Sequence, residues 1–158
     1  MVGKWEEVGE VKNTMLIGEY THTLDDKSRV SIPAKFRKEL GNKVVVTNGL
    51  DTCLFVFSLS AWNRFSEQLA SLSFAQGDKR KFSRFMLGGA VEVEVDSIGR
   101  VLLPEFLKKF AGLNEKVVIT GIHDRVEIWN DRSWAEYKKN VEKDVDILAE
   151  KLGEVGAL

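Results

Sequence analysis

An aspartate and an arginine recur at the same spacing in two short stretches of this chain of 158 residues. The first copy is Asp25-Asp26-Lys27-Ser28-Arg29, and the second is Asp96-Ser97-Ile98-Gly99-Arg100. An aspartate that begins a turn accepts hydrogen bonds from backbone N–H groups two or three residues on. We therefore assign Asp25 and Asp96 a structural role. An arginine directly after a tight turn projects outward, where its planar fork can bond phosphate or the O6 and N7 atoms of guanine.

Two other interpretations of the same turns stay open. Each arginine can pair with the aspartate four residues before it and serve only to fix the turn. Alternatively, the two aspartates are catalytic carboxylates, which requires a deep pocket and raised carboxyl pKa values. No nucleophile accompanies them, and neither His22 nor His123 has zinc-ligand spacing to a partner. We therefore expect no enzyme activity, metal, cofactor or small-molecule substrate.

Positive charge is concentrated in the first copy. Three basic side chains accompany Arg29 there: Lys27, Lys35 and Arg37. The matching positions of the second copy hold Ile98, Phe106 and Lys108. The two halves are therefore unequal in charge. The net charge of −1 is a mild argument against a nucleic-acid partner, but a neutral molecule can still carry a basic face.

The turns belong to a longer repeat that relates residues 18–41 to residues 89–112. The identical pairs are Gly18/Gly89, Asp25/Asp96, Arg29/Arg100, Val30/Val101, Pro33/Pro104, Lys38/Lys109 and Gly41/Gly112. In each copy an alternating strand, the turn and a second strand lead to a short helix that proline opens and glycine caps. Two more strands follow, at 43–47 and 53–57 in the first copy and at 116–120 and 126–129 in the second. A unit of about 40 residues rarely folds alone, so we expect two interleaved copies with a shared core.

Helices connect and follow the repeats. Ser60 is a predicted N-cap for a helix whose apolar residues recur at 3–4 spacing from Trp62 to Leu72. The basic run at 77–84 is interpreted as a solvated helix face. A C-terminal apolar stripe comprises Trp134, Tyr137, Val141, Val145, Leu148 and Leu152. Packing of this stripe against the chain's own sheet and packing against a neighbouring subunit both stay open.

The organisation predicted from these patterns has five segments. They are a polar N-terminal extension (1–14), a first repeat (19–61), a helical linker (62–88), a second repeat (90–133) and a C-terminal helix (134–158). Cys53 lies in an apolar stretch and is interpreted as a buried structural thiol. A single cysteine excludes an internal disulfide and fits a reducing cytoplasm. No apolar run approaches the roughly 20 residues that span a bilayer, so we expect no membrane association.

The segment GEYTHTLDDKSRVSIPAKFR (residues 18–37) and the paired turns resemble the MraZ family of bacterial transcriptional regulators, over about residues 15–152. The resemblance implies an α+β fold of two SpoVT–AbrB-type halves that form a swapped-hairpin β-barrel. It implies ring-shaped homo-oligomers on double-stranded DNA, at repeated promoter elements of the division and cell-wall gene cluster. It also implies a cytoplasmic, nucleoid-associated location. The expected DNA-binding residues are Arg29, Lys27, Lys35, Arg37 and Arg100. With this resemblance, the uneven charge predicts unequal halves, in which the first makes most contacts to DNA and the second mainly completes the barrel while contributing Arg100.

The first turn departs from the usual family pattern Asp-x-x-Gly-Arg. Gly99 fits the pattern in the second copy, but Ser28 replaces glycine in the first. If this position needs a positive φ, serine is strained there by about 1 kcal/mol. Either the first turn has another geometry or its neighbours hold it.

The modest charge also predicts how DNA is bound. A single protomer offers few phosphate contacts, so a ring on spaced DNA repeats would gain affinity through avidity. The alternative is an antitoxin-like swapped-hairpin module that binds DNA and a protein partner.

Overall fold

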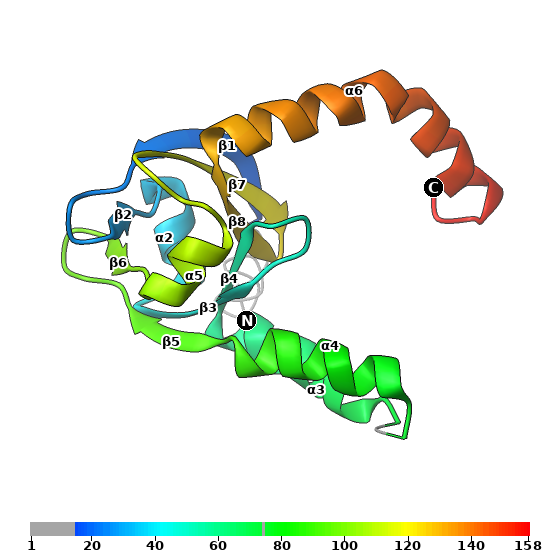
Figure 1. Cartoon of the computed structure of the whole chain (residues 1–158), viewed down its shortest axis with the longest axis horizontal. Helices are drawn as coiled ribbons and strands as arrows, with labels where there is room; N and C mark the ends of the chain where they lie inside the picture. The colour runs from blue at the N-terminus through cyan, green and yellow to red at the C-terminus, as the bar shows by residue number, and fades with distance from the viewer. Residues whose placement is uncertain (1–14, 74) are drawn as a thin grey trace, which may run out of the picture.

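One antiparallel sheet combines strands of both repeats. The computed structural model describes residues 15–73 and 75–158, so the predicted N-terminal extension lies outside the described residues. The six strands, in sheet order, are β1 (Leu16–Thr23), β7 (Lys116–His123), β8 (Arg125–Asn130), β4 (Leu54–Ser58), β3 (Lys43–Asn48) and β5 (Val91–Glu94). All five neighbouring pairs are antiparallel. The mixed α+β fold with a mainly antiparallel sheet is therefore confirmed (Figure 1).

The first strand of each repeat pairs with a strand of the other repeat. β1 pairs with β7 of the second repeat, and β5 pairs with β3 of the first. A separate two-stranded ribbon joins β2 (Arg29–Ser31) to β6 (Arg100–Leu102), with Val30 opposite Val101. The first two strands of each repeat thus find their hydrogen-bond partners in the other repeat. Within the described residues, β1 and β5 form the two edges of the larger sheet.

A hydrophobic cluster fills one side of the sheet and includes both repeats. The short helices α2 (Ala34–Leu40) and α5 (Glu105–Phe110) contribute Phe36 and Leu107, which have no exposed surface. Val30 and Val101 of the ribbon are equally buried. Because side chains alternate along a strand, the other face of β4, β7 and β8 supplies a second cluster. The longer helices pack there.

The capping residues differ in part from those predicted. Gly41 is the C-cap of α2 with φ 81°, but Ala111 caps α5 and Gly112 follows with φ 61°. Pro33 and Pro104 stand one residue before their helices. The prediction of Ser60 as N-cap was wrong. The helix α3 (Leu59–Ser71) begins earlier, because the Ser58 hydroxyl accepts a hydrogen bond from the Ala61 N–H at 3.2 Å.

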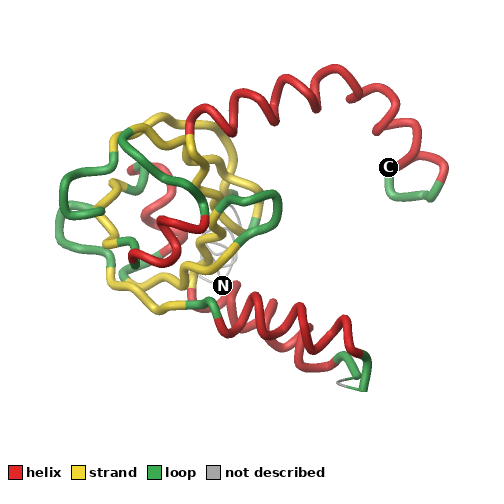
Figure 2. The backbone as a smooth tube through the Cα atoms, viewed as in Figure 1, coloured by secondary structure: helices red, strands yellow, loops and turns green. Residues whose placement is uncertain are grey.

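Two helical arms extend from the strand-rich body (Figure 2). One arm is α3 with the antiparallel α4 (Gly77–Gly88), and the other is the C-terminal helix α6 (Asp131–Glu154). Asn130 caps α6, since its side chain accepts hydrogen bonds from the N–H groups of Arg132 and Ser133. None of the helices in the described part of the chain is long and apolar enough to cross a bilayer.

Candidate nucleic-acid interface

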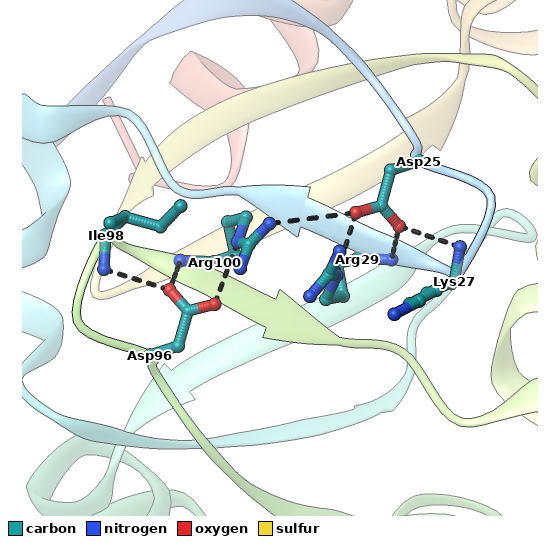
Figure 3. A network of polar contacts seen from close by, with 6 residues as sticks. All are labelled: Asp25, Lys27, Arg29, Asp96, Ile98 and Arg100. Atoms are coloured by element: carbon teal, nitrogen blue, oxygen red, sulfur yellow. Dashed lines mark hydrogen bonds and ion pairs between the residues drawn. The ribbon is translucent and has the colours of Figure 1, made fainter.

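The first turn is built around the carboxylate of Asp25. One of its oxygens accepts hydrogen bonds from the backbone N–H of Lys27 at 2.9 Å and of Arg29 at 2.8 Å. Its other oxygen accepts from the Nε of Arg29 at 2.8 Å. Figure 3 shows these contacts in one view. The backbone closes the same turn, because the Ser28 N–H donates to the Asp25 carbonyl at 3.0 Å.

The second turn repeats this geometry. Asp96 accepts from the backbone N–H of Ile98 at 3.1 Å and from the N–H and Nε of Arg100, both at 2.8 Å. The pKa of each aspartate lies below its ordinary value, chiefly because the backbone N–H of the arginine stabilises the charged carboxylate. Both carboxylates are therefore ionised at neutral pH.

Arg29 and Arg100 lie on the outer face of the β2–β6 ribbon. Val30 and Val101 face the core, so the residues on either side of them face outward. The Arg29 side chain keeps 29% of its surface exposed and that of Arg100 keeps 28%. The Nη1 of Arg100 also lies 4.0 Å from a carboxylate oxygen of Asp25, which links the two turns (Figure 3).

The structure contains the arginine–aspartate pairs that one interpretation of the sequence expected, and both arginine side chains remain partly exposed. Each arginine pairs with its own aspartate through Nε, which fixes the direction of the guanidinium. The amino groups at the end of Arg29 remain as donors for a further partner, whereas Nη1 of Arg100 also lies near Asp25. A two-stranded antiparallel ribbon with outward arginines has dimensions that the DNA major groove admits.

Ser28 and Gly99 adopt the same left-handed conformation, with φ 63° and φ 86°. The two turns therefore share one geometry, and neighbours hold Ser28 in place. The Ser28 hydroxyl accepts a hydrogen bond from the Nζ of Lys108 at 3.0 Å. The residue that corresponds to Lys108 in the first repeat is Arg37, whose guanidinium lies against Gly99.

The remaining basic residues fall in two groups. Lys27 lies in the first turn and is exposed, and Lys35 is an exposed residue of α2. Arg37 belongs to the first repeat in sequence but lies at the second turn in space. Lys108 also belongs to this site, although the sequence analysis named it only as the residue that matches Arg37. Its position opposite Arg37 in the repeat was the signal that pointed to it.

The geometry of these turns gives little support to the alternatives of paired catalytic carboxylates or a metal site. The nearest groove, of about 620 Å³, is lined by Lys27, Ser28 and residues of β5 and β6 but not by the two aspartates. Their lowered pKa values are the opposite of what a catalytic pair requires. Among the residues that the structure describes, no group of histidine, cysteine and acidic side chains is arranged to hold a metal.

The lone cysteine is also unsuited to catalysis. Cys53 is fully buried, and its thiol donates a hydrogen bond to the Leu50 carbonyl. Burial raises the pKa of this thiol far above its ordinary value. Because the thiolate is the reactive form, Cys53 is not poised as a nucleophile.

Comparisons with known proteins agree with the resemblance seen in the sequence. The family model described as "MraZ protein, putative antitoxin-like" matches twice, at residues 15–85 and 86–152. The transcriptional regulator MraZ of Caldanaerobacter subterraneus subsp. tengcongensis is 49% identical over 138 residues, which cover 87% of this chain and 96% of that protein. The protein of the same name from Moorella thermoacetica is 48% identical over 138 residues, with the same coverage. That from Syntrophomonas wolfei is 43% identical over 142 residues, which cover 90% of this chain and 99% of that protein. The family model matches both halves of the chain, and the relatives are 43–49% identical over at least 87% of it. This chain therefore belongs to the MraZ family.

Proposed function

We propose that this protein is a sequence-specific DNA-binding transcriptional regulator. The observation that carries the proposal is the ribbon that presents Arg29 and Arg100 side by side, each oriented by a carboxylate and partly exposed. Relatives that match nearly their whole length are named transcriptional regulators. A guanidinium held in a fixed direction loses less entropy when it binds guanine or phosphate than a mobile one.

Within this proposal, the arginines and lysines have different tasks. Arg29 and Arg100 read base edges or clamp phosphates from the ribbon. Lys27, Lys35 and Arg37 contact the phosphate backbone around them, so the first repeat supplies most of the contacts. Phosphate contacts set position and affinity, whereas sequence is read at the base edges.

We further propose that the protein acts as a ring-shaped homo-oligomer on repeated promoter elements of the division and cell-wall gene cluster. With a net charge of −1, one protomer has a weak hold on DNA at cellular salt. Several linked ribbons would raise the avidity by about 10²–10⁴ without any new contact. The exposed apolar stripe of α6 supports assembly, because an amphipathic helix gains most of its stability by burying that face.

Three further parts of the proposal concern fold and location. The strand exchange between repeats supports a swapped-hairpin barrel as the architecture. We keep the predicted segments 19–61, 62–88, 90–133 and 134–158 as its units. A regulator that binds promoters would be cytoplasmic and associated with the nucleoid.

The proposal is tested by replacing Arg29 with alanine. We expect Arg29→Ala to lower affinity for a duplex from the region upstream of the protein's own gene at least 10-fold, because one good bidentate base contact contributes about 1–3 kcal/mol. The measurement is a gel-shift titration at several salt concentrations, with the oligomeric state followed by light scattering.

Arg132→Ala is the matched control, since it removes the same charge from α6, far along the chain from the ribbon. It should bind DNA like the unmodified protein. An Arg29→Ala protein with unchanged affinity and an unchanged salt dependence would contradict the proposal.

A second candidate is an antitoxin-like module that also binds a protein partner, which the words "putative antitoxin-like" in the family description favour. Such modules usually carry a disordered partner-binding tail, whereas α6 is helical to Glu154. Limited proteolysis distinguishes the two candidates: rapid removal of residues after about 140 would favour the antitoxin-like module.

A further inference from the structure

The short helix of each repeat reaches across to the arginine-bearing turn of the other repeat. Arg37 in α2 and Lys108 in α5 occupy matching positions of the repeat. Arg37 lies against Gly99 of the second turn. Lys108 contacts Ser28 of the first turn, 80 residues away in sequence. The two contacts are therefore reciprocal.

A side chain at position 99 would require the Arg37 guanidinium to move. A Cβ atom added to Gly99 would lie 2.2 Å from both Cζ and Nε of Arg37 and 2.7 Å from its Nη1. The guanidinium is held there, because Nε donates to the Ile32 carbonyl at 2.8 Å. The Ile32 N–H in turn donates to the Gly99 carbonyl at 2.8 Å. Two hydrogen bonds through Ile32 thus connect Arg37 of α2 to the second turn.

The Lys108 contact differs from the Arg37 contact, because it is made to a side chain of the turn. Its amine donates to the Ser28 hydroxyl at 3.0 Å, so here a side chain in the turn is needed. The Leu103 N–H donates to the Ser28 carbonyl at 2.9 Å, which corresponds to the bond between Ile32 and Gly99. The Lys108 side chain is 27% exposed, and its only acidic neighbour among the described residues is Glu105 at 3.9 Å.

We propose that Arg37 and Lys108 are positioning residues, each of which holds the arginine-bearing turn of the opposite repeat in its left-handed conformation. Two matched pairs result: the larger arginine lies over a glycine, and the smaller lysine bonds a serine. Arg29 is then aimed by a residue of the second repeat, and Arg100 by a residue of the first. The inference rests on the proposed function for its effect on DNA, but the contacts themselves can be tested without DNA.

Mismatched pairs should damage the turns, and rematched pairs should repair them. Lys108→Arg places a guanidinium where the Ser28 side chain stands, and Gly99→Ser places a side chain where the Arg37 guanidinium lies. The double variants K108R/S28G and G99S/R37K recreate at each turn the pair found at the other. The single variants S28G and R37K complete both double-mutant cycles, so that the pairwise coupling is separated from the glycine or lysine effect alone.

The first readout is hydrogen exchange of the Leu103 and Ile32 amides, which donate to the two turns. We expect K108R to accelerate exchange at Leu103, and G99S at Ile32, about 10-fold or more, with a fall in melting temperature of about 2–4 °C. Each double variant should return to within about 2-fold of the unmodified protein. If K108R fails to fold, K108M, which lacks the donor, should accelerate exchange at Leu103 while K108Q, which keeps one, should not.

The second readout is affinity for the upstream duplex. A positioning role predicts that K108R weakens binding about 10-fold without changing the salt dependence, because the number of phosphate contacts is unaltered. Restoration by S28G supports the inference. The inference is overturned if the effects of the double variants on exchange and affinity equal the sums of the effects of the single variants. It is also overturned if K108R has a weaker salt dependence of DNA binding, which would mean that fewer counterions are released. If hydrogen exchange shows strong coupling but the unmodified protein does not bind DNA at all, the proposed function is wrong. The positioning role of Arg37 and Lys108 is then kept.

Discussion

Asp25 affects Arg29 in two opposing ways. Its carboxylate holds the guanidinium through Nε at 2.8 Å and fixes the backbone of the turn. The same negative charge lies beside a surface that is proposed to meet phosphates, where it is repulsive. The lowered pKa of Asp25 means that its ionised form is stabilised by the folded turn. This stabilisation is fully present above the ordinary carboxyl pKa of about 4 and is lost as pH falls below it, so experiments at neutral pH test the ionised form.

Asp25→Ala separates these two effects. If charge alone mattered, removing the carboxylate would tighten DNA binding. We expect the opposite, a loss of about 10-fold at pH 7, because the N–H groups of Lys27 and Arg29 lose their acceptor and the guanidinium loses its direction. A gel-shift titration measures the affinity.

Asp26→Ala is the matched control, because Asp26 is the exposed neighbour in the same turn and carries the same charge. Its removal should leave binding unchanged or slightly tighter. Equal tightening by both variants would show that Asp25 acts through charge and not through geometry.

Among the elements, α3 offers a direct comparison between two serines at one helix start. Ser58 caps the helix by accepting the Ala61 N–H, whereas Ser60 lies within the first turn and its hydroxyl lies 3.3 Å from the Ser58 hydroxyl. Ser58→Ala should lower the free energy of unfolding by about 1 kcal/mol, the usual contribution of an N-cap. Urea titration followed by circular dichroism measures this change.

Ser60→Ala should stay within about 0.5 kcal/mol of the unmodified protein, as most substitutions away from such features do. A larger loss for Ser60 than for Ser58 would move the start of the helix to the position that the sequence first suggested.

Local patterns in the sequence were sufficient to predict the elements but not their partners. Strand alternation, the paired prolines and the Asp-x-x-x-Arg spacing all act over a few residues, and each predicted strand and helix is present within a few residues of its expected place. Cap assignment failed at Ser60 because two serines within three positions satisfy the same rule. The pairing of β1 with β7, and the reach of Arg37 to Gly99, depend on how the repeats interleave, which no local pattern encodes.

At the scale of the whole molecule, the apolar stripe of α6 packs on the body at its start and is exposed further along. At its start, Trp134 and Tyr137 pack on Trp129 with ring centroids 5.2 Å and 4.9 Å apart. The same face continues through Val145, Leu148 and Leu152, which are 51%, 41% and 45% exposed. The helix leaves the body of the molecule after its first turns (Figure 1). A second copy of the chain that covers this part would extend a contact that the first part already makes.

Leu148→Glu should therefore break the proposed assembly, because it places a charge in the centre of the buried stripe. The expected result is a shift to smaller species in analytical ultracentrifugation, with a loss of DNA affinity of about 10² or more as avidity disappears. Ile147→Glu is the matched control: Ile147 is also exposed, at 54%, but with 3.6 residues per turn it lies about 100° around the helix from Leu148. If both variants assemble like the unmodified protein, or both fall apart alike, the stripe does not form the contact between copies, and the ring must be held together by another surface.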